Sequence, residues 1–346
     1  MYDIITIGTA TRDVFLQSSL FKVLRDPEHL SRIGFHTAEA QCFALGSKVE
    51  VKNLIFSTGG GATNTAVTFS RQGLKTAALF KIGKDRAGEE IFDELKRENV
   101  SIMAVIDWKG STAYSTILIS PNGERTILVY RGTSDELTHE EIPFNRLKTR
   151  WAYISPGGID FWLVNDLVNH FYKNGVAIAI NPSKKLIEKK LTGLSNILSK
   201  AKVVILNREE AAYLTGINYQ REKSIFKELD RAVPGIAVMT DGERGVLASD
   251  GHKIYHTGVF KEKKVVDRTG AGDAFGSGFV AGLIHRKEGC EKGLCRPDNI
   301  KYAIRLGSAN ATSVIEHISA KTGILTKIEF EKNERWKNLH IETVKL

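Results

Sequence analysis

The amino-acid sequence predicts an α/β protein with a doubly wound, mostly parallel central sheet, helices on both faces and a small β-rich lid. Short, nearly continuous apolar runs alternate with helix-like segments, which is typical of parallel strands covered by helices. One pair of apolar runs is instead joined by Asn-Gly, a strong hairpin signal. Two glycine-rich turns stand directly before helical segments. The hairpin and an irregular early segment interrupt the alternation, and we assign them to the lid.

Length and composition limit the class of protein. The chain has 346 residues, of which 42% are hydrophobic and 26% charged, and this ordinary globular composition excludes a collagen-like repeat and a coiled coil. The length allows two domains, or one large domain with an appendage. We expect one domain over residues 1–346, with a lid formed by approximately 13–52 and 111–131.

The overall charge and the cysteines bear on partners and compartment. Lys and Arg number 49 against 40 Asp and Glu, a formal charge of +9, but the two signs are interleaved and no aromatic-basic motif occurs. No apolar run approaches the roughly 18 residues that cross a bilayer, and the N-terminus lacks the basic start of a signal peptide. Cys42, Cys290 and Cys295 match neither a disulfide framework nor a zinc pattern. We therefore expect a cytoplasmic protein with free thiols and with no nucleic-acid or membrane partner.

Periodicity and turn residues place the elements of the first part of the chain. An opening strand ends on glycine, an irregular polar segment covers 18–52, and a glycine turn then opens a helix that Gly73 ends. The expected elements are Tyr2–Gly8 as a strand, Ser57–Asn64 as the turn, Ala77–Ile82 as a strand and about Gly88–Glu98 as a helix.

The second part of the chain begins with the hairpin of Thr112–Ser120 and Arg125–Tyr130, joined by Pro121-Asn-Gly-Glu124. Apolar strands then alternate with helical segments, including a helix over Ile304–Ile315. The expected strands are Trp151–Ser155, Ala177–Ile180, Val203–Leu206, Ile236–Thr240 and Gly245–Ser249.

The most informative segment is the turn Asp267-Arg-Thr-Gly-Ala-Gly-Asp273, which runs into a helix with the apolar face Phe275, Phe279 and Leu283. The first amides of a helix lack intrahelical acceptors, so Gly270-Ala-Gly272 forms a site for an anion. Asp273 beside it could accept a proton from an attacking hydroxyl, a pairing that phosphoryl transfer needs. The alternative is that Asp273 is only a favourable acid in the first turn of a helix.

Two segments resemble the signatures of one enzyme family. No P-loop occurs, and a dinucleotide fingerprint fails because Phe275 stands where its third glycine would be. Asp267–Asp273 resembles the second signature of the ribokinase, or PfkB, family of carbohydrate kinases, and Thr58–Asn64 resembles the first. The resemblance extends from Tyr2 to about Leu325 and implies a ribokinase-like fold and phosphorylation by ATP with Mg²⁺. It further implies the roles of Asp273 as general base and of Gly270, Ala271 and Gly272 as the anion hole.

The resemblance also implies residues that hold ATP and Mg²⁺. Asn207 and Glu210 by themselves predict a helix capping box, and in the family this pair helps to hold Mg²⁺, largely through water. Both interpretations can apply to the same residues. Thr240 and Gly242 resemble the turn that contacts nucleotide phosphates, with a plain turn as the alternative. Asn310 resembles a residue lining the adenine pocket, with an exposed helical asparagine as the alternative.

A monovalent cation, K⁺, is a further cofactor that the resemblance suggests. Asp267 and Thr269 resemble positions that contribute to such a site in many members of the family. The later loop His317–Gly323 departs from the family's small Gly-Ala pattern, which argues against activation by K⁺.

Four residues resemble those that bind the phosphoryl acceptor, a small polyol. Asp13 would accept hydrogen bonds from sugar hydroxyls, with a turn acid as the alternative. Gly59 and Gly60 would let the backbone approach the sugar closely, and Asn64 would offer its amide to a hydroxyl. The hairpin would close over the sugar and exclude water. Since an exposed apolar β-flap usually needs covering, we expect a homodimer formed through the lid.

Three functions remain open from the sequence. The first is a kinase for a ketose, ribose or a related sugar or sugar acid. The second is a nucleoside kinase, in which Phe15, Phe35 or Phe43 of the lid could stack on a purine. The third is a nucleotide-binding regulator without catalysis, suggested by the charge of +9.

Overall fold

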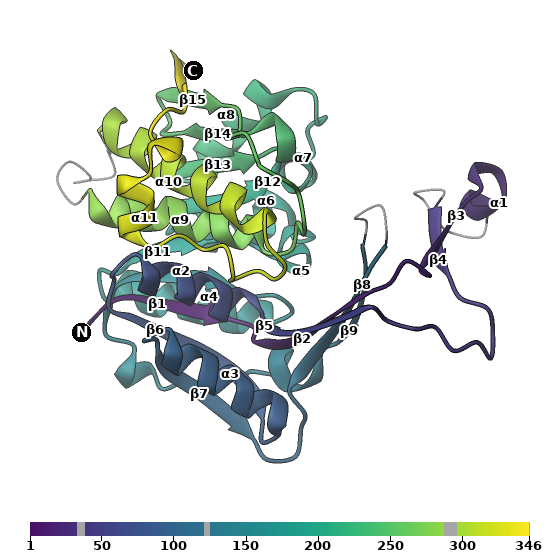
Figure 1. The fold of residues 1–346 in the computed structure, drawn as a ribbon. Coiled ribbons are helices and arrows are strands. Elements are labelled where there is room, and N and C mark those ends of the chain that lie inside the picture. Colours follow the sequence, from purple (N-terminus) through teal and green to yellow (C-terminus); the bar gives the residue numbers. More distant parts are fainter. Residues whose placement is uncertain (33–38, 121–124, 287–295, 346) are drawn as a thin grey trace.

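The computed structural model describes residues 1–32, 39–120, 125–286 and 296–345 of the chain (Figure 1). Three expectations therefore lie outside the described residues: the hairpin turn at 121–124, the thiols of Cys290 and Cys295, and the side chain of Phe35.

A large, mostly parallel sheet forms the centre of the body. In the described part of the chain it has ten strands in the order β16-β15-β14-β13-β12-β11-β10-β1-β6-β7. Every pair from β13 to β7 is parallel, while the pairs β13–β14, β14–β15 and β15–β16 are antiparallel. The strands are β1 Tyr2–Gly8, β6 Thr76–Gly83, β7 Ser101–Asp107, β10 Thr149–Ser155, β11 Ala177–Ile180, β12 Val203–Asn207, β13 Ile236–Thr240, β14 Val246–Ser249, β15 Lys253–Thr257 and β16 Glu342–Lys345.

Helices cover both faces of this sheet, as the sequence predicted. One face packs against helices whose apolar side chains share a core with β1, β10 and β11. These helices are α4 Phe161–Lys173, α5 Lys184–Ile187, α6 Lys190–Leu198, α7 Arg208–Thr215 and α8 Glu222–Ala232. The other face packs against the helices in the foreground of Figure 1. These are α2 Gly61–Arg71, α3 Arg86–Arg97, α9 Ala271–His285, α10 Pro297–Ile315 and α11 Lys327–Lys332.

Helices α9 and α10 pack against each other unusually closely. A Cβ on Gly282 of α9 would lie 2.6 Å from the Cα of Ala303 of α10, so only glycine fits at this crossing. The apolar face of Phe275, Phe279 and Leu283 is buried, as expected. Packing against α10 therefore explains Gly278 and Gly282, and close contact with Tyr153 of β10 explains Gly276. This packing fixes where the N-terminus of α9 lies.

A second, four-stranded sheet extends from the body in the order β5-β2-β8-β9 (Figure 1). Its strands are β2 Thr11–Gln17, β5 Asn53–Gly59, β8 Ala113–Ile119 and β9 Arg125–Tyr130. The predicted hairpin strands are present as β8 and β9, but the expected ranges omitted β5. Beyond this sheet, β3 Lys22–Arg25 and β4 Glu39–Cys42 pair as a ribbon that carries α1 Pro27–Arg32. The segment read as irregular is thus partly ordered.

Candidate active site

The predicted anion site lies at the N-terminus of α9, which begins directly after Gly270. Gly270 has a φ of 79°, in the left-handed region, and a Cβ there would lie 2.3 Å from the Cβ of Ala320. A Cβ on Gly272 would contact nothing within 4 Å, so space is open above the first turn. The first-turn amides of α9 therefore face a position where an anion can approach.

Asp273 occupies the same first turn and is held by a residue from a distant part of the chain. Its Oδ2 accepts a hydrogen bond from Asn64 Nδ2 at 2.9 Å, and Asn64 lies in the first turn of α2. Burial raises the pKa of Asp273 above its ordinary value, while the Asn64 hydrogen bond and the charge of Lys321 partly oppose that rise. The residue as a whole is half-buried, next to the open space at Gly272, so a bound molecule can approach it.

The residues expected to bind the acceptor lie where the second sheet joins the body. Asp13 of β2 is buried, and its Oδ1 accepts a hydrogen bond from Thr11 Oγ1 at 2.9 Å. A Cβ on Gly59 would lie 2.0 Å from Asp13 Oδ2, so this position requires glycine. Asn64 Oδ1 is buried without a hydrogen-bond partner among the described residues. A buried acceptor of this kind favours a ligand that brings a hydroxyl donor.

The residues expected to contact the nucleotide line one cavity of about 380 Å³. Thr240 and Gly242 line it at the end of β13, and Asn207 does so at the end of β12. Ala271 and Gly272 of the anion site border the same cavity. Its apolar wall consists of Val246, Val259, Phe260, Val265, Phe275, Ala311 and Ile315. An apolar pocket that ends at helix amides fits a molecule with a flat base and an anionic end.

Asn310 is the one predicted nucleotide-binding residue that the structure places elsewhere. It is fully buried, donates from Nδ2 to the carbonyl of Ala274 at 3.0 Å and accepts at Oδ1 from the amide of Leu325 at 2.9 Å. Ser308 and Ala311, on another face of α10, border the cavity instead. The expectation for Asn310 was wrong because the helix turns this side chain toward α9.

The capping box at Asn207 and Glu210 is present. The Asn207 side chain accepts from the Glu210 amide, and Glu210 Oε2 accepts from the Asn207 amide at 2.8 Å. Burial raises the pKa of Glu210. The described residues contain no group of three or more His, Cys, Asp or Glu side chains placed to hold a metal. Mg²⁺ commonly binds substrate phosphates, water and one or two carboxylates, so this site fits Mg²⁺ only as a companion of a phosphate ligand.

The surroundings of Asp267 do not fit a K⁺ site. Asp267 Oδ1 accepts from the amide and hydroxyl of Thr269, and Oδ2 accepts from the amide of Ser319 at 3.2 Å. The guanidinium of Arg125, on β9, lies 3.8 Å from Asp267 Oδ1. These hydrogen-bond donors and the charge of Arg125 already occupy the Asp267 carboxylate, which K⁺ would need as a ligand.

A charged cluster behind the nucleotide turn was not recognised from the sequence. Asp241, between Thr240 and Gly242, accepts from Arg208 Nη1 at 2.8 Å and from the hydroxyl of Tyr219 at 2.6 Å. Arg244 also binds Asp241, and its hydrogen bonds lower the Asp241 pKa strongly. An acid between Thr240 and Gly242 was the available signal, but two of its three partners, Arg208 and Tyr219, are distant in sequence. The cluster makes the turn rigid where it borders the cavity.

The aromatic residues considered for stacking on a base are not placed for it. Phe15 is only 1% exposed and belongs to a small core of the second sheet with Ile117 and Ile119. Phe43 packs edge-on against Phe21, with ring centroids 5.5 Å apart, in the segment beyond that sheet. Neither supports a purine site.

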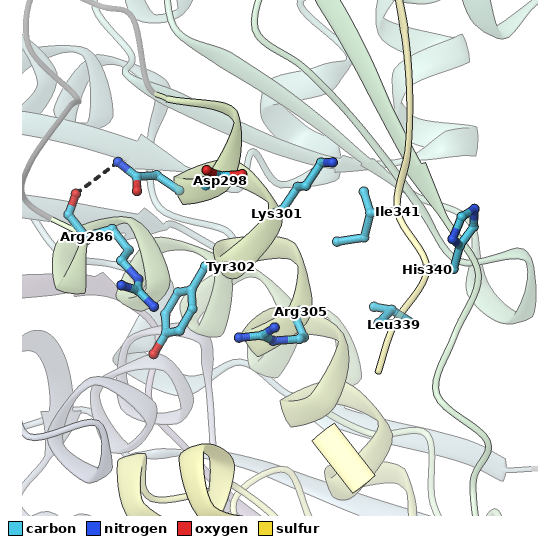
Figure 2. Close-up of a pocket in the computed structure, with 9 residues that line it drawn as sticks. Arg286, Asp298, Lys301, Tyr302, Arg305, Leu339, His340 and Ile341 are labelled. Atoms are coloured by element: carbon cyan, nitrogen blue, oxygen red, sulfur yellow. Dashed lines mark hydrogen bonds between the residues drawn. The ribbon is translucent and has the colours of Figure 1, made fainter. Parts of the chain in front are cut away.

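A larger cavity, of about 460 Å³, lies on the outer side of α10 (Figure 2). Residues 339–341 form one wall, and the remainder is lined by Arg286 and by Asp298, Asn299, Lys301, Tyr302 and Arg305 of α10. None of the residues implicated in catalysis or nucleotide binding borders it. Size alone therefore does not identify the active site.

Comparison with known proteins gives a consistent result. Residues 32–327 match the family model described as pfkB family carbohydrate kinase. The chain is 26% identical over 265 residues to an uncharacterized sugar kinase of Archaeoglobus fulgidus, covering 75% of this chain and 99% of that protein. It is 28% identical over 277 residues to a cytidine kinase of Thermococcus kodakarensis, covering 78% and 94%.

A solved structure supports the same fold. The ribokinase from Giardia lamblia superposes with a TM-score of 0.77 at 18% sequence identity, covering 95% of this chain and 97% of that one. In the described part of the chain, no helix has both the length and the apolar character needed to span a membrane.

Proposed function

Because the chain belongs to the pfkB family of carbohydrate kinases, we propose that it transfers the terminal phosphoryl group of ATP to a hydroxyl of a small sugar, with Asp273 as general base. The observation that carries this proposal is the hydrogen bond of 2.9 Å between Asp273 Oδ2 and Asn64 Nδ2. This hydrogen bond joins the second signature segment to the first, although more than two hundred residues separate them in the sequence. The base and the acceptor-binding side chains therefore meet at one point.

The reaction follows from the groups at this point. Asp273 takes the proton of the acceptor hydroxyl while that oxygen forms a bond to the terminal phosphorus. The bond between this phosphorus and the oxygen it shares with ADP breaks, and ADP leaves. The amides of Gly270, Ala271 and Gly272 stabilise charge on the transferred group, and general-base assistance contributes about 10²–10⁴-fold. When bound with ATP, Mg²⁺ would neutralise phosphate charge, and Glu210 would help to hold it through water.

The remaining site residues have separate tasks in this proposal. Asn207, Thr240 and Gly242 hold the nucleotide, since they border one cavity with the anion site. Asp13, Gly59, Gly60 and Asn64 hold the acceptor. The sheet β5-β2-β8-β9 is the lid of a single kinase domain, and the contact of Arg125 with Asp267 supports this role because it joins the lid to the catalytic turn. A closed lid keeps water from the phosphoryl group.

The lid also supports the proposal of a homodimer. Its strands expose large apolar side chains that a monomer would leave in water, namely Leu54, Phe56, Tyr114, Ile127, Leu128, Val129 and Tyr130. A second copy of the chain could cover them. Size-exclusion chromatography with light scattering tests this: the expected mass is twice that of the chain, and Leu128→Glu should give a monomer.

Use of ATP as donor favours action in the cytoplasm.

A nucleoside kinase is the second candidate, supported by the likeness to the cytidine kinase of Thermococcus kodakarensis. The deciding experiment measures ADP release from ATP with a panel of ketoses, pentoses, sugar acids and nucleosides. Turnover with a sugar and none with any nucleoside is expected. Preference for a nucleoside would replace the first candidate. ATP binding without ADP release from any acceptor would favour a regulator without catalysis.

A further inference from the structure

A buried lysine lies in the loop that follows α10. Lys321 is 2% exposed, and its Nζ donates to Thr58 Oγ1 and to Glu94 Oε2, the latter at 3.1 Å. Lysine is rarely buried to this degree, because its charge must leave water. Glu94 of α3 offers a partner charge but is itself 21% exposed in its side chain. The position of Lys321 therefore needs an explanation beyond packing.

The contacts of this loop join the lid strand to the catalytic turn. Thr58 is the residue before Gly59, against which the Asp13 carboxylate lies. Ala320, the residue before Lys321, packs on Gly270 at the start of α9. Lys321 thus holds the end of β5 while its neighbour supports the anion site.

The charge of Lys321 acts on both carboxylates of the proposed site. It lowers the pKa of Asp273 and the pKa of Asp13, against the burial that raises each. The other groups that act on Asp13 are Thr11, Ser115 and Arg12, and Arg12 also pairs with Glu90 of α3. Asp273 receives the hydrogen bond from Asn64, and burial together with the charge of Asp273 raises the pKa of the Tyr153 phenol. Lys321 is the cation that these two carboxylates share.

We propose that Lys321 is a positioning residue for phosphoryl transfer: its buried ammonium fastens the end of β5, at Thr58, to α3 and supplies the positive charge that favours ionisation of Asp13 and Asp273. This inference rests on the proposed function, because it takes Asp273 as the base. An ionised Asp273 is ready to accept a proton, and an ionised Asp13 accepts hydrogen bonds from the acceptor. One buried charge favours both states at once.

The test compares Lys321→Met, which removes the charge at similar length, with Lys321→Arg, which retains it. In Lys321→Met, the acid-side midpoint of the kcat/KM profile should move up by several tenths to about one pH unit. In Lys321→Arg, that midpoint should stay in place even where the rate falls. A ¹³C NMR titration of the aspartate carboxyls, with Asp273 assigned from Asp273→Asn, should show the same shifts without any turnover.

Arg71→Met serves as the matched control. Arg71 Nη1 donates to the carbonyls of Lys321 and Ile324 at 3.0 and 2.8 Å, so its loss loosens the same loop. It is not among the groups that act on Asp13 or Asp273. Arg71→Met should lower Tm and leave the acid-side midpoint unchanged.

Two results would overturn the inference. One is that Lys321→Met lowers Tm and rate as Arg71→Met does, with no shift of either carboxyl titration. The other, available if Lys321→Met does not fold, is that Lys321→Gln, which keeps a hydrogen-bond donor at this position but removes the charge, shifts neither carboxyl titration. Failure of the proposed function would look different: the wild-type protein would turn over no acceptor, while the carboxyl titrations still shifted.

Discussion

Replacement of Asp273 by asparagine tests the proposed chemistry most directly. The amide keeps the shape of the side chain beside Asn64, but it cannot accept the proton of a hydroxyl. Loss of a general base lowers the rate about 10²–10⁴-fold, so kcat should fall within that range. The nucleotide cavity is bordered by Ala271 and Gly272 and not by the Asp273 side chain, so the affinity for ATP should be retained.

The same substitution should not destabilise the fold. Burial raises the pKa of Asp273, so the ionised carboxylate lowers the free energy of unfolding. This decrease in the free energy of unfolding is absent at pH values below the ordinary pKa of an aspartate. It is complete once the pH exceeds the raised pKa of Asp273 in the folded protein. Asp273→Asn should therefore melt at or above the wild-type temperature at pH 7, and the difference should vanish toward pH 4. Each kcal/mol recovered corresponds to about 2 °C in Tm for a chain of this size.

The assay measures ADP release with the preferred acceptor, ATP binding by calorimetry, and Tm across the pH range. Asp160→Asn is the matched control, because Asp160 caps α4 on the other face of the sheet and accepts from the Trp162 amide at 2.8 Å. Asparagine caps a helix as well as aspartate does, so kcat should not change. Near-normal turnover in Asp273→Asn would refute the assignment of the base.

Three further predictions follow from the geometry. Gly59→Ala places a Cβ 2.0 Å from the original position of Asp13 Oδ2. The kcat/KM for the acceptor should therefore fall about 10- to 100-fold, while KM for ATP is unchanged. An equal loss for both substrates would argue against a specific role at the acceptor. Asn310→Ala leaves two buried backbone groups unpaired and should cost about 2–4 kcal/mol of stability, seen as a lower denaturant midpoint, with no change in KM for ATP. Exchange of K⁺ for Na⁺ should leave kcat unchanged, because protein donors and Arg125 already surround Asp267; several-fold activation by K⁺ would contradict this.

Local sequence signals were sufficient where the physics is local. The opening strand, the turn that starts α2, and the capping box at Asn207 and Glu210 each depend on residues a few positions apart, and each is present. Strands β7 and β15 were not anticipated, and β14 pairs antiparallel with β13, a direction that the sequence analysis had not assigned. Apolar runs indicate that a strand is buried, but not the direction in which it pairs.

Side-chain direction within a helix was harder to predict. Phe275 and Asn310 both lie on helices recognised from the sequence, yet Phe275 borders the nucleotide cavity and Asn310 faces the core. The polarity of asparagine suggested solvent or a ligand. The neighbouring carbonyl of Ala274 and amide of Leu325, which satisfy its hydrogen bonds inside the protein, could not be inferred from spacing.

By itself the sequence determined the class of fold and the chemical types available for catalysis, because an amphipathic period, a glycine turn and an acid beside helix amides are properties of short segments. The tertiary structure alone brought Asp273 to Asn64, enclosed Asp241 between arginines and buried Lys321 between the lid strand and α3. These contacts join segments far apart along the chain. Burial and distance, which set the pKa of a carboxylate, arise only once those segments pack together.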